Sequence, residues 1–193
     1  SYAELNQKER AINWLRSALN KLGRADEEIL NLQGLYYGDL GDYKRQEKLY
    51  READRATASW GGPLFNLAWS FYNRGKYKEA TETLEQAMKK DHRQGPYLTL
   101  KAMCLDKSEP QISHKLIYQQ AIKAFGAAST LSEWELGWYL TAVQAVGDSK
   151  AIKDAEEERK KRNKKGITEV DEDAALPVVK GGLVQRKKAM FNF

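Results

Sequence analysis

The stretch that decides the fold is Gly62–Tyr77, GPLFNLAWSFYNRGKY. Leu64, Ala68 and Phe71 recur at steps of four and three residues, which places them on one face of a helix. Gly75 then supplies a permissive turn backbone. A second apolar face follows at helical spacing, formed by Ala80, Leu84 and Ala87. The stretch therefore predicts two helices joined by a tight turn, with small alanines where the helices cross.

The same pattern recurs along the chain. Gly41 stands 34 residues before Gly75 (75 − 34 = 41), and Glu109 takes the corresponding place 34 residues after it. The packing positions of the first copy are Leu30, Gly34, Tyr37, Tyr50 and Ala53, and those of the third are Leu98, Ala102, Leu105, Tyr118 and Ala121. A slip of four residues leads to a fourth copy at Gly147, with Leu136, Leu140, Val143 and Ile152. An accidental amphipathic helix would not keep this spacing, so the chain is predicted to be a repeat protein.

A helix pair of about 34 residues with this alternation of small and large residues resembles the tetratricopeptide repeat. The resemblance implies an all-α fold: a right-handed α-solenoid of about four helix pairs, with an extra N-terminal helix and an extended C-terminal tail. Residues 1–165 would form the repeat domain, with a helix at 3–22 and repeats at about 27–60, 61–94, 95–130 and 131–165, and residues 166–193 would form the tail. Helices are expected at about 27–40, 42–57, 62–74, 76–90, 95–106, 110–125, 131–146 and 148–164.

The helix at 3–22 carries Ala11, Leu15 and Ala18, the spacing of Ala80, Leu84 and Ala87. It therefore corresponds to the second helix of a repeat whose first helix is absent. Either it caps the stack as a single helix, or the chain was cut from a longer array. A solenoid normally ends in a polar cap, whereas this helix is rich in apolar residues, which favours the cut.

Composition narrows the class of protein. Hydrophobic residues make up 41% of the 193 residues and charged residues 31%, which suits a one-dimensional stack with much surface. The net charge is +5, and a single cysteine excludes an internal disulfide. No apolar run reaches the roughly 18 residues of a membrane span, and no signal peptide is visible, so a cytoplasmic location is expected.

The sequence offers no catalytic or cofactor-binding pattern. His92 and His114 stand alone, without acidic or cysteine partners at ligand spacing, and there is no phosphate-binding glycine loop. Cys104 lies beside the packing positions Ala102 and Leu105, which indicates a buried structural thiol. We therefore expect no catalytic residues, no cofactor and no metal, and the protein is not expected to be an enzyme.

Candidate binding residues follow from the resemblance, because the inner faces of the first helices of tetratricopeptide repeats form a concave groove for peptides or partner helices. By register, Phe65, Trp69 and Tyr72 would form an aromatic row there, beside the amides of Asn66 and Asn73. The other predicted groove residues are Asn31, Leu35, Thr99, Met103, Trp138 and Thr141, with Trp134 and Gln144 at the far end. The alternative is that the aromatic side chains belong to the core.

The sequence thus predicts a scaffold or adaptor that binds a protein or peptide partner in its groove. The groove lacks the cations with which related co-chaperones clamp acidic peptide ends, so an apolar or mixed ligand is favoured. Two alternatives remain: a nucleic-acid-binding repeat protein that uses the basic helix 150–165 and the tail segment 183–188, and a regulatory C-terminal domain of a larger polypeptide. Nucleic acid is disfavoured because Arg and Lys are not interleaved in the groove. The tail, or a second protomer, could itself occupy the groove.

Overall fold

The computed structural model describes residues 2–164, and the side chains of residues 5–163. This part of the chain forms helices only: α1 (Tyr2–Leu22), α2 (Glu27–Asp39), α3 (Tyr43–Ala56), α4 (Gly62–Asn73), α5 (Tyr77–Lys90), α6 (Gln94–Ser108), α7 (Lys115–Phe125), the short 3-10 helix η1 (Ala128–Thr130), α8 (Glu133–Val146) and α9 (Ser149–Lys164). The predicted all-α fold is confirmed. The predicted C-terminal tail, residues 166–193, lies outside the described residues.

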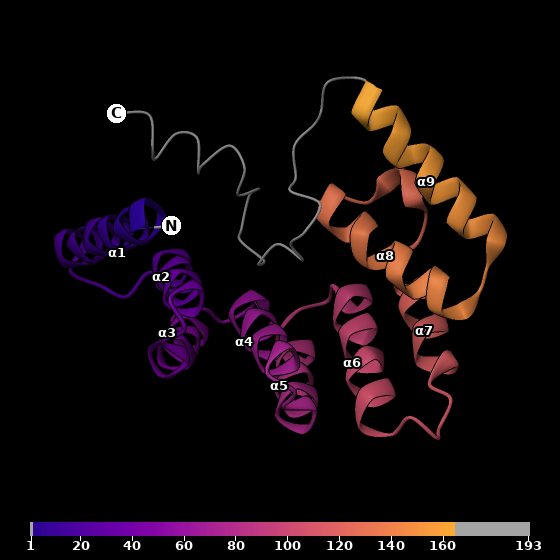
Figure 1. Cartoon of the computed structure of the whole chain (residues 1–193), viewed down its shortest axis with the longest axis horizontal. Coiled ribbons are helices and arrows are strands. Elements are labelled where there is room, and N and C mark those ends of the chain that lie inside the picture. Colours follow the sequence, from indigo (N-terminus) through magenta and orange to yellow (C-terminus); the bar gives the residue numbers. More distant parts are fainter. Residues whose placement is uncertain (1, 165–193) are drawn as a thin grey trace.

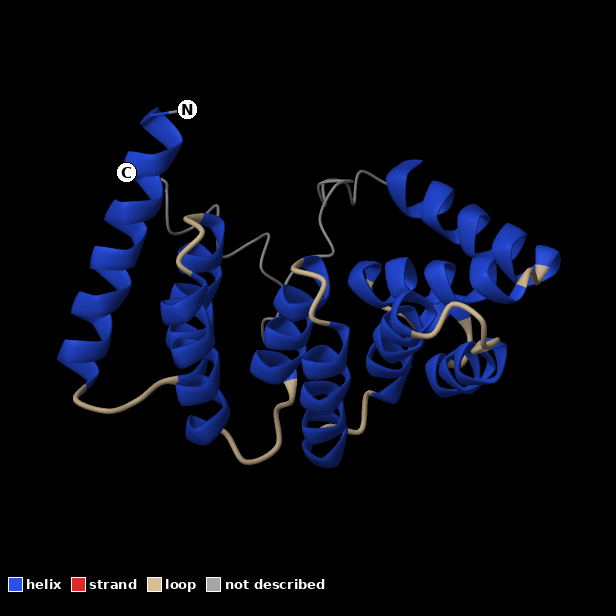
Figure 2. Cartoon of the chain, turned by 60° about the horizontal axis from the view of Figure 1, so that its bottom comes forward, coloured by secondary structure: helices blue, strands red, loops and turns tan. Residues whose placement is uncertain are grey.

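The helices form consecutive pairs along a curved stack (Figures 1 and 2). The pairs are α2 with α3, α4 with α5, α6 with α7 and α8 with α9, and each second helix also packs against the first helix of the following pair. α1 lies at one end of the stack and contacts α2, and α9 lies at the other end (Figure 1). This arrangement is the solenoid of about four helix pairs that the sequence predicts.

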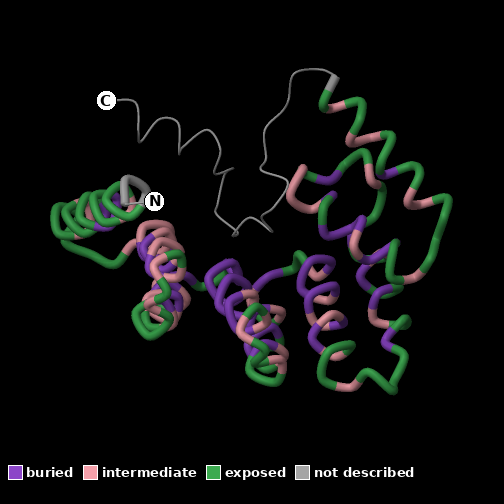
Figure 3. Tube along the Cα trace, viewed as in Figure 1, coloured by how far each residue is buried: buried purple, intermediate pink, exposed green. Residues whose placement is uncertain are grey.

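The core runs through the inside of the stack, where first and second helices meet (Figure 3). The predicted crossing residues Ala68, Ala87, Ala102 and Ala121 are all fully buried, as their small size requires. At the start of α6 a helix contact involves glycine, which is smaller still than alanine. A Cβ atom on Gly95 would lie 2.7 Å from the ring of Phe125, so this contact between α6 and the end of α7 requires glycine.

Local sequence signals fix most of the helix ends. Gly75 has a φ of 72° in the turn between α4 and α5, a conformation that glycine adopts at no steric cost. Ser132 accepts a hydrogen bond from the Glu135 amide, and the Glu135 side chain accepts one from the Ser132 amide, which forms a capping box at the start of α8. The predicted helix ends agree with the structure within two residues, apart from the start of α7.

α7 begins at Lys115, not at residue 110 as predicted from Pro110. The intervening residues form a turn, in which the Ile112 amide donates to the Glu109 carbonyl over 3.0 Å. His114 is held at the end of this turn by Asp106, whose carboxylate lies 3.0 Å from Nδ1. This side-chain contact across the turn is not encoded in local helix propensity.

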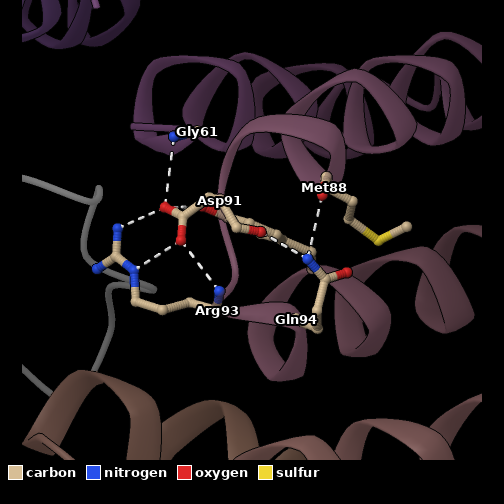
Figure 4. Close-up of polar contacts among 6 residues, drawn as sticks. Gly61, Met88, Asp91, Arg93 and Gln94 are labelled. Atoms are coloured by element: carbon tan, nitrogen blue, oxygen red, sulfur yellow. Dashed lines mark hydrogen bonds and ion pairs between the residues drawn. The ribbon is translucent and has the colours of Figure 1, made fainter. Parts of the chain in front are cut away.

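A buried carboxylate holds together the joint between the second and third pairs (Figure 4). Asp91, at the end of α5, accepts hydrogen bonds from the Gly61 amide (3.3 Å), the Tyr97 hydroxyl (2.9 Å) and the Arg93 guanidinium (2.7 Å). Its other oxygen accepts from the Arg93 amide over 3.0 Å. Burial raises the pKa of Asp91, but the hydrogen bonds from Arg93 and Tyr97 outweigh it and bring the pKa to about 2. The carboxylate therefore ties the starts of α4 and α6 to the end of α5.

Candidate concave binding surface

The predicted aromatic row lies along α4. Phe65 is buried, whereas Trp69 and Tyr72 are half-buried. The rings of Trp69 and Tyr72 stack with centroids 5.4 Å apart and an interplanar angle of 13°, and Tyr72 also contacts Tyr77 of α5 at 5.6 Å. These contacts pack the two rings against their neighbours, and together they present a partly exposed aromatic surface.

The fourth helix pair closes over part of this row. Trp138 of α8 makes edge-to-face contacts with Phe65 (5.3 Å, 88°) and Trp69 (5.4 Å, 89°), and Trp134 contacts Phe65 at 5.5 Å. In a simple solenoid each repeat contacts only its neighbours, yet here the fourth pair reaches the second. Between them α6 presents Thr99, which is fully buried and donates to the Gly95 carbonyl.

The structure therefore divides the predicted groove residues into two groups. Those that are buried inside the protein are Asn31, Phe65, Asn66, Thr99 and Trp138. Those that keep exposed surface are Leu35, Trp69, Tyr72, Met103 and Thr141, which are half-buried, and Asn73, which is exposed. Of the two residues expected at the far end, Trp134 is half-buried and Gln144 is exposed. The buried group has at most a trace of surface with which a ligand could make contact.

Two of the amides expected to face a peptide contact each other. Asn66 Nδ2 donates to Asn31 Oδ1 over 2.9 Å, which links α4 to α2. Both side chains are buried, so this hydrogen bond satisfies polar groups that would otherwise be costly to remove from water. The sequence indicated amides at these positions, but not that they would form a hydrogen bond between the first helices of two successive pairs.

Beside the aromatic row lies a polar cluster that was not predicted from the sequence. Asp106 of α6 accepts from the Tyr118 hydroxyl over 2.7 Å and lies 3.0 Å from His114 Nδ1. Glu109 lies 3.7 Å from His114 Nε2, so the prediction that His114 is isolated was wrong. The residues are separated by the irregular turn before α7, and this is why helical spacing did not associate them.

Burial, followed by the nearby Cys104, Tyr77 and Asp106, raises the pKa of Tyr72.

Nothing in the described part of the chain suggests metal or thiol chemistry. Over the residues described, no group of three or more His, Cys, Asp or Glu side chains could hold a metal ion. Cys104 is fully buried, as predicted, and burial raises the pKa of its thiol to about 12. A search of the same residues for a helix long and apolar enough to cross a membrane finds none.

The basic residues of α9 are partly engaged within the protein. Arg159 and Arg162 lie 3.4 Å and 3.6 Å from the carboxylate of Glu133, and Arg162 also donates to Glu158 over 2.9 Å. These ion pairs connect α9 to the start of α8, which gives the two arginines a structural role at the end of the stack. A nucleic acid would have to break these ion pairs before its phosphates could bind both guanidinium groups.

Comparison with known proteins finds a matching repeat family and similar solved structures. Residues 27–59 and 63–89 match a family model described as tetratricopeptide repeat, which covers α2 to α5. No curated protein sequence matches the chain. Among solved structures, the chain is similar to YrrB, described as a tetratricopeptide repeat protein with an unusual peptide-binding site. The two are 19% identical, the match covers 82% of this chain and 78% of YrrB, and the TM-score is 0.44.

Proposed function

The chain is a tetratricopeptide repeat protein, and we propose that it is a scaffold that binds a peptide or an extended segment of a protein partner on the open part of its concave face. We call this part the aromatic surface and define it by Trp69, Tyr72, Asn73, Met103 and Thr141. The observation that carries the proposal is the stacked pair of Trp69 and Tyr72, which is only half-buried.

The chemistry of the surface indicates the kind of ligand. Trp and Tyr provide a large contact area at a low cost in side-chain entropy, and such residues dominate the energy of many interfaces. The exposed amide of Asn73 can hydrogen-bond with a peptide backbone, and Met103 can adapt to an apolar side chain. We therefore expect a ligand with apolar or aromatic side chains, not an acidic chain terminus.

The closed part of the concave face limits where the ligand lies. Trp138 packs edge to face with Phe65 and Trp69 and so already covers part of the surface that a ligand would otherwise contact. The ligand would therefore run past the outer edge of Trp69 toward Tyr72, next to the turn between α4 and α5. Binding in this proposal requires no chemistry on the ligand, so the protein acts as an interaction module and not as an enzyme.

Affinity capture with the full chain tests the proposal. Proteins captured by the wild type would be compared with those captured by Trp69→Ala, Tyr72→Ala and the control Leu116→Ala, which removes an apolar side chain that is 66% exposed on α7. Truncation of an aromatic hot spot costs about 2 kcal/mol or more, or about 30-fold in affinity. We expect a partner that both aromatic variants lose and the control retains. Retention of every captured protein by both aromatic variants would contradict the proposal.

A further inference from the structure

The row of residues on the inner faces of the first helices changes character from α4 to α6. In the repeat spacing of 34 residues, Trp69 of α4 corresponds to Met103 of α6. Tyr72 corresponds in the same way to Asp106 (72 + 34 = 106). α4 and α6 belong to successive pairs and contact each other. The aromatic row of α4 therefore continues on α6 with a carboxylate in the position of Tyr72.

Electrostatic effects show that this carboxylate lies close to the aromatic surface. Asp106 is one of the groups that raise the pKa of Tyr72, after burial, Cys104 and Tyr77. Burial raises the pKa of Tyr118 as well, and this rise is increased by the hydrogen bond to Asp106, by its charge and by Tyr72. Tyr72, Tyr118 and Asp106 therefore lie near one another where α4, α6 and α7 meet.

The carboxylate of Asp106 is anchored from below and open to solvent. One oxygen accepts from the Tyr118 hydroxyl over 2.7 Å, and the other lies 3.0 Å from His114 Nδ1. Tyr118 and His114 are buried, whereas the Asp106 side chain is 43% exposed. A carboxylate can accept about four hydrogen bonds, so Asp106 keeps acceptor sites for a ligand.

The charges around Asp106 leave it without a cationic partner. Among the described residues, no Lys or Arg forms an ion pair with Asp106 or with Glu109, the second carboxylate beside His114. In the turn after α4, Arg74 lies over two aromatic rings and Lys76 pairs with Glu79 at 3.7 Å. Lys107, which follows Asp106, is exposed and is the local cation that an acidic ligand would use instead.

We propose that the aromatic surface selects peptides that carry a Lys or Arg side chain, and that Asp106 binds the charged end of this side chain. The inference rests on the proposed function, because it names the chemistry of the ligand at the same site. The methylene groups of the Lys or Arg pack on the exposed parts of the Trp69 and Tyr72 rings, while the ammonium or guanidinium group donates to Asp106. Since an exposed ion pair contributes little, the rings supply most of the affinity and Asp106 supplies the selectivity.

A peptide library on beads tests this selectivity with the full chain. Each peptide carries one fixed Phe, and the neighbouring positions hold Lys, Arg, Gln, Glu or Leu in random combination. The labelled protein is incubated with the beads, and the bound peptides are sequenced. We expect Lys and Arg to be enriched over Gln. The net charge of +5 would by itself favour Glu, so this enrichment would report on the local carboxylate.

Matched variants then assign the preference to Asp106. A selected Lys peptide and its version with Gln in place of Lys are titrated by fluorescence anisotropy. Asp106→Asn should weaken the Lys peptide about fivefold and leave the Gln peptide unchanged. The control Glu82→Gln, which removes an exposed carboxylate of α5, should bind both peptides like the wild type. Trp69→Ala should weaken both peptides about 30-fold.

Three results would overturn the inference and leave the proposed function in place, provided that Trp69→Ala still weakens binding. The first is equal selection of Lys, Arg and Gln by the wild type. The second is an unchanged preference for Lys in Asp106→Asn, with circular dichroism showing that the variant is folded. The third is selection of Glu that Lys107→Gln abolishes. Peptides that bind Trp69→Ala as tightly as the wild type would contradict the proposed function itself, and a chain that selects no peptide would overturn both.

Discussion

Replacement of Asp91 by asparagine tests the joint between the second and third helix pairs. The variant keeps the shape of the side chain but removes the negative charge that four donor groups from Gly61, Arg93 and Tyr97 surround. The difference between an ordinary aspartate pKa of about 3.9 and the folded value of about 2 corresponds to about 2.5 kcal/mol of folding free energy. We therefore expect Asp91→Asn to lower the free energy of unfolding at neutral pH by about 2 kcal/mol.

The sign of the pH dependence follows from the direction of this shift. Because the folded pKa of Asp91 is depressed, its stabilisation is complete above the unfolded pKa and is lost as the pH falls toward the folded pKa of about 2. Urea unfolding of both proteins, followed by circular dichroism from about pH 7 to about pH 3, measures the effect. The difference in unfolding free energy between them should fall to about half by about pH 3.

A matched control separates this site from a general loss of charge. Asp39→Asn removes a carboxylate whose side chain is 48% exposed and whose partner is Lys8. An exposed pair of this kind contributes about 1 kcal/mol or less, so the control should remain close to the wild type at all pH values. A difference between Asp91→Asn and the wild type that stays constant over the whole pH range would refute the reasoning, because the charge of Asp91 would then not be the source of the stability.

Three further predictions concern packing and reactivity. Ala87→Leu should lower the free energy of unfolding by about 1–3 kcal/mol, measured by urea unfolding, because Ala87 is fully buried at a helix crossing; an unchanged stability would show that the crossing has space. Trp138→Ala should lower the free energy of unfolding by about 3–5 kcal/mol in the same urea experiment, because the indole is buried against Phe65 and Trp69. Trp138→Phe should lower it clearly less, and equal losses for the two variants would contradict these ring contacts. Cys104, with its pKa raised to about 12, should react with a thiol-alkylating reagent at about pH 8 only after denaturation, as mass spectrometry would show; rapid reaction of the native protein would exclude a buried thiol.

The fold could be predicted because its signal is local and repeated. The small residues at the helix crossings, such as Ala68 and Ala102, keep one spacing over several copies, and the buried positions follow from it. The turns at Gly41 and Gly75 were likewise visible, since both have the positive φ that glycine accepts. Repeat spacing therefore gives the helices, their pairs and the faces that enter the core.

The inner surface could be predicted only in part, because it depends on contacts between helices that are distant in the sequence. The repeat register places Phe65 and Trp138 on inner faces, but it does not predict that α8 lies close enough to α4 for their rings to make contact. The segment between α7 and α8, which contains the short 3-10 helix η1, also interrupts the repeat spacing. The hydrogen bond between Asn31 and Asn66 is hidden from the sequence for the same reason. Long-range packing overrides what the pattern of a single helix implies.

The most direct test of the proposed function is a nuclear magnetic resonance titration of the full chain with the partner segment that affinity capture identifies. The indole N–H signals of the five tryptophans and the methyl signal of Met103 report on separate places in the molecule. Binding to the aromatic surface predicts that the signals of Trp69 and Met103 shift in a saturable way, while the indole signal of Trp14 stays in place. Saturable shifts that leave the signals of Trp69 and Met103 unchanged would contradict the proposal, because the partner would then bind elsewhere on the molecule.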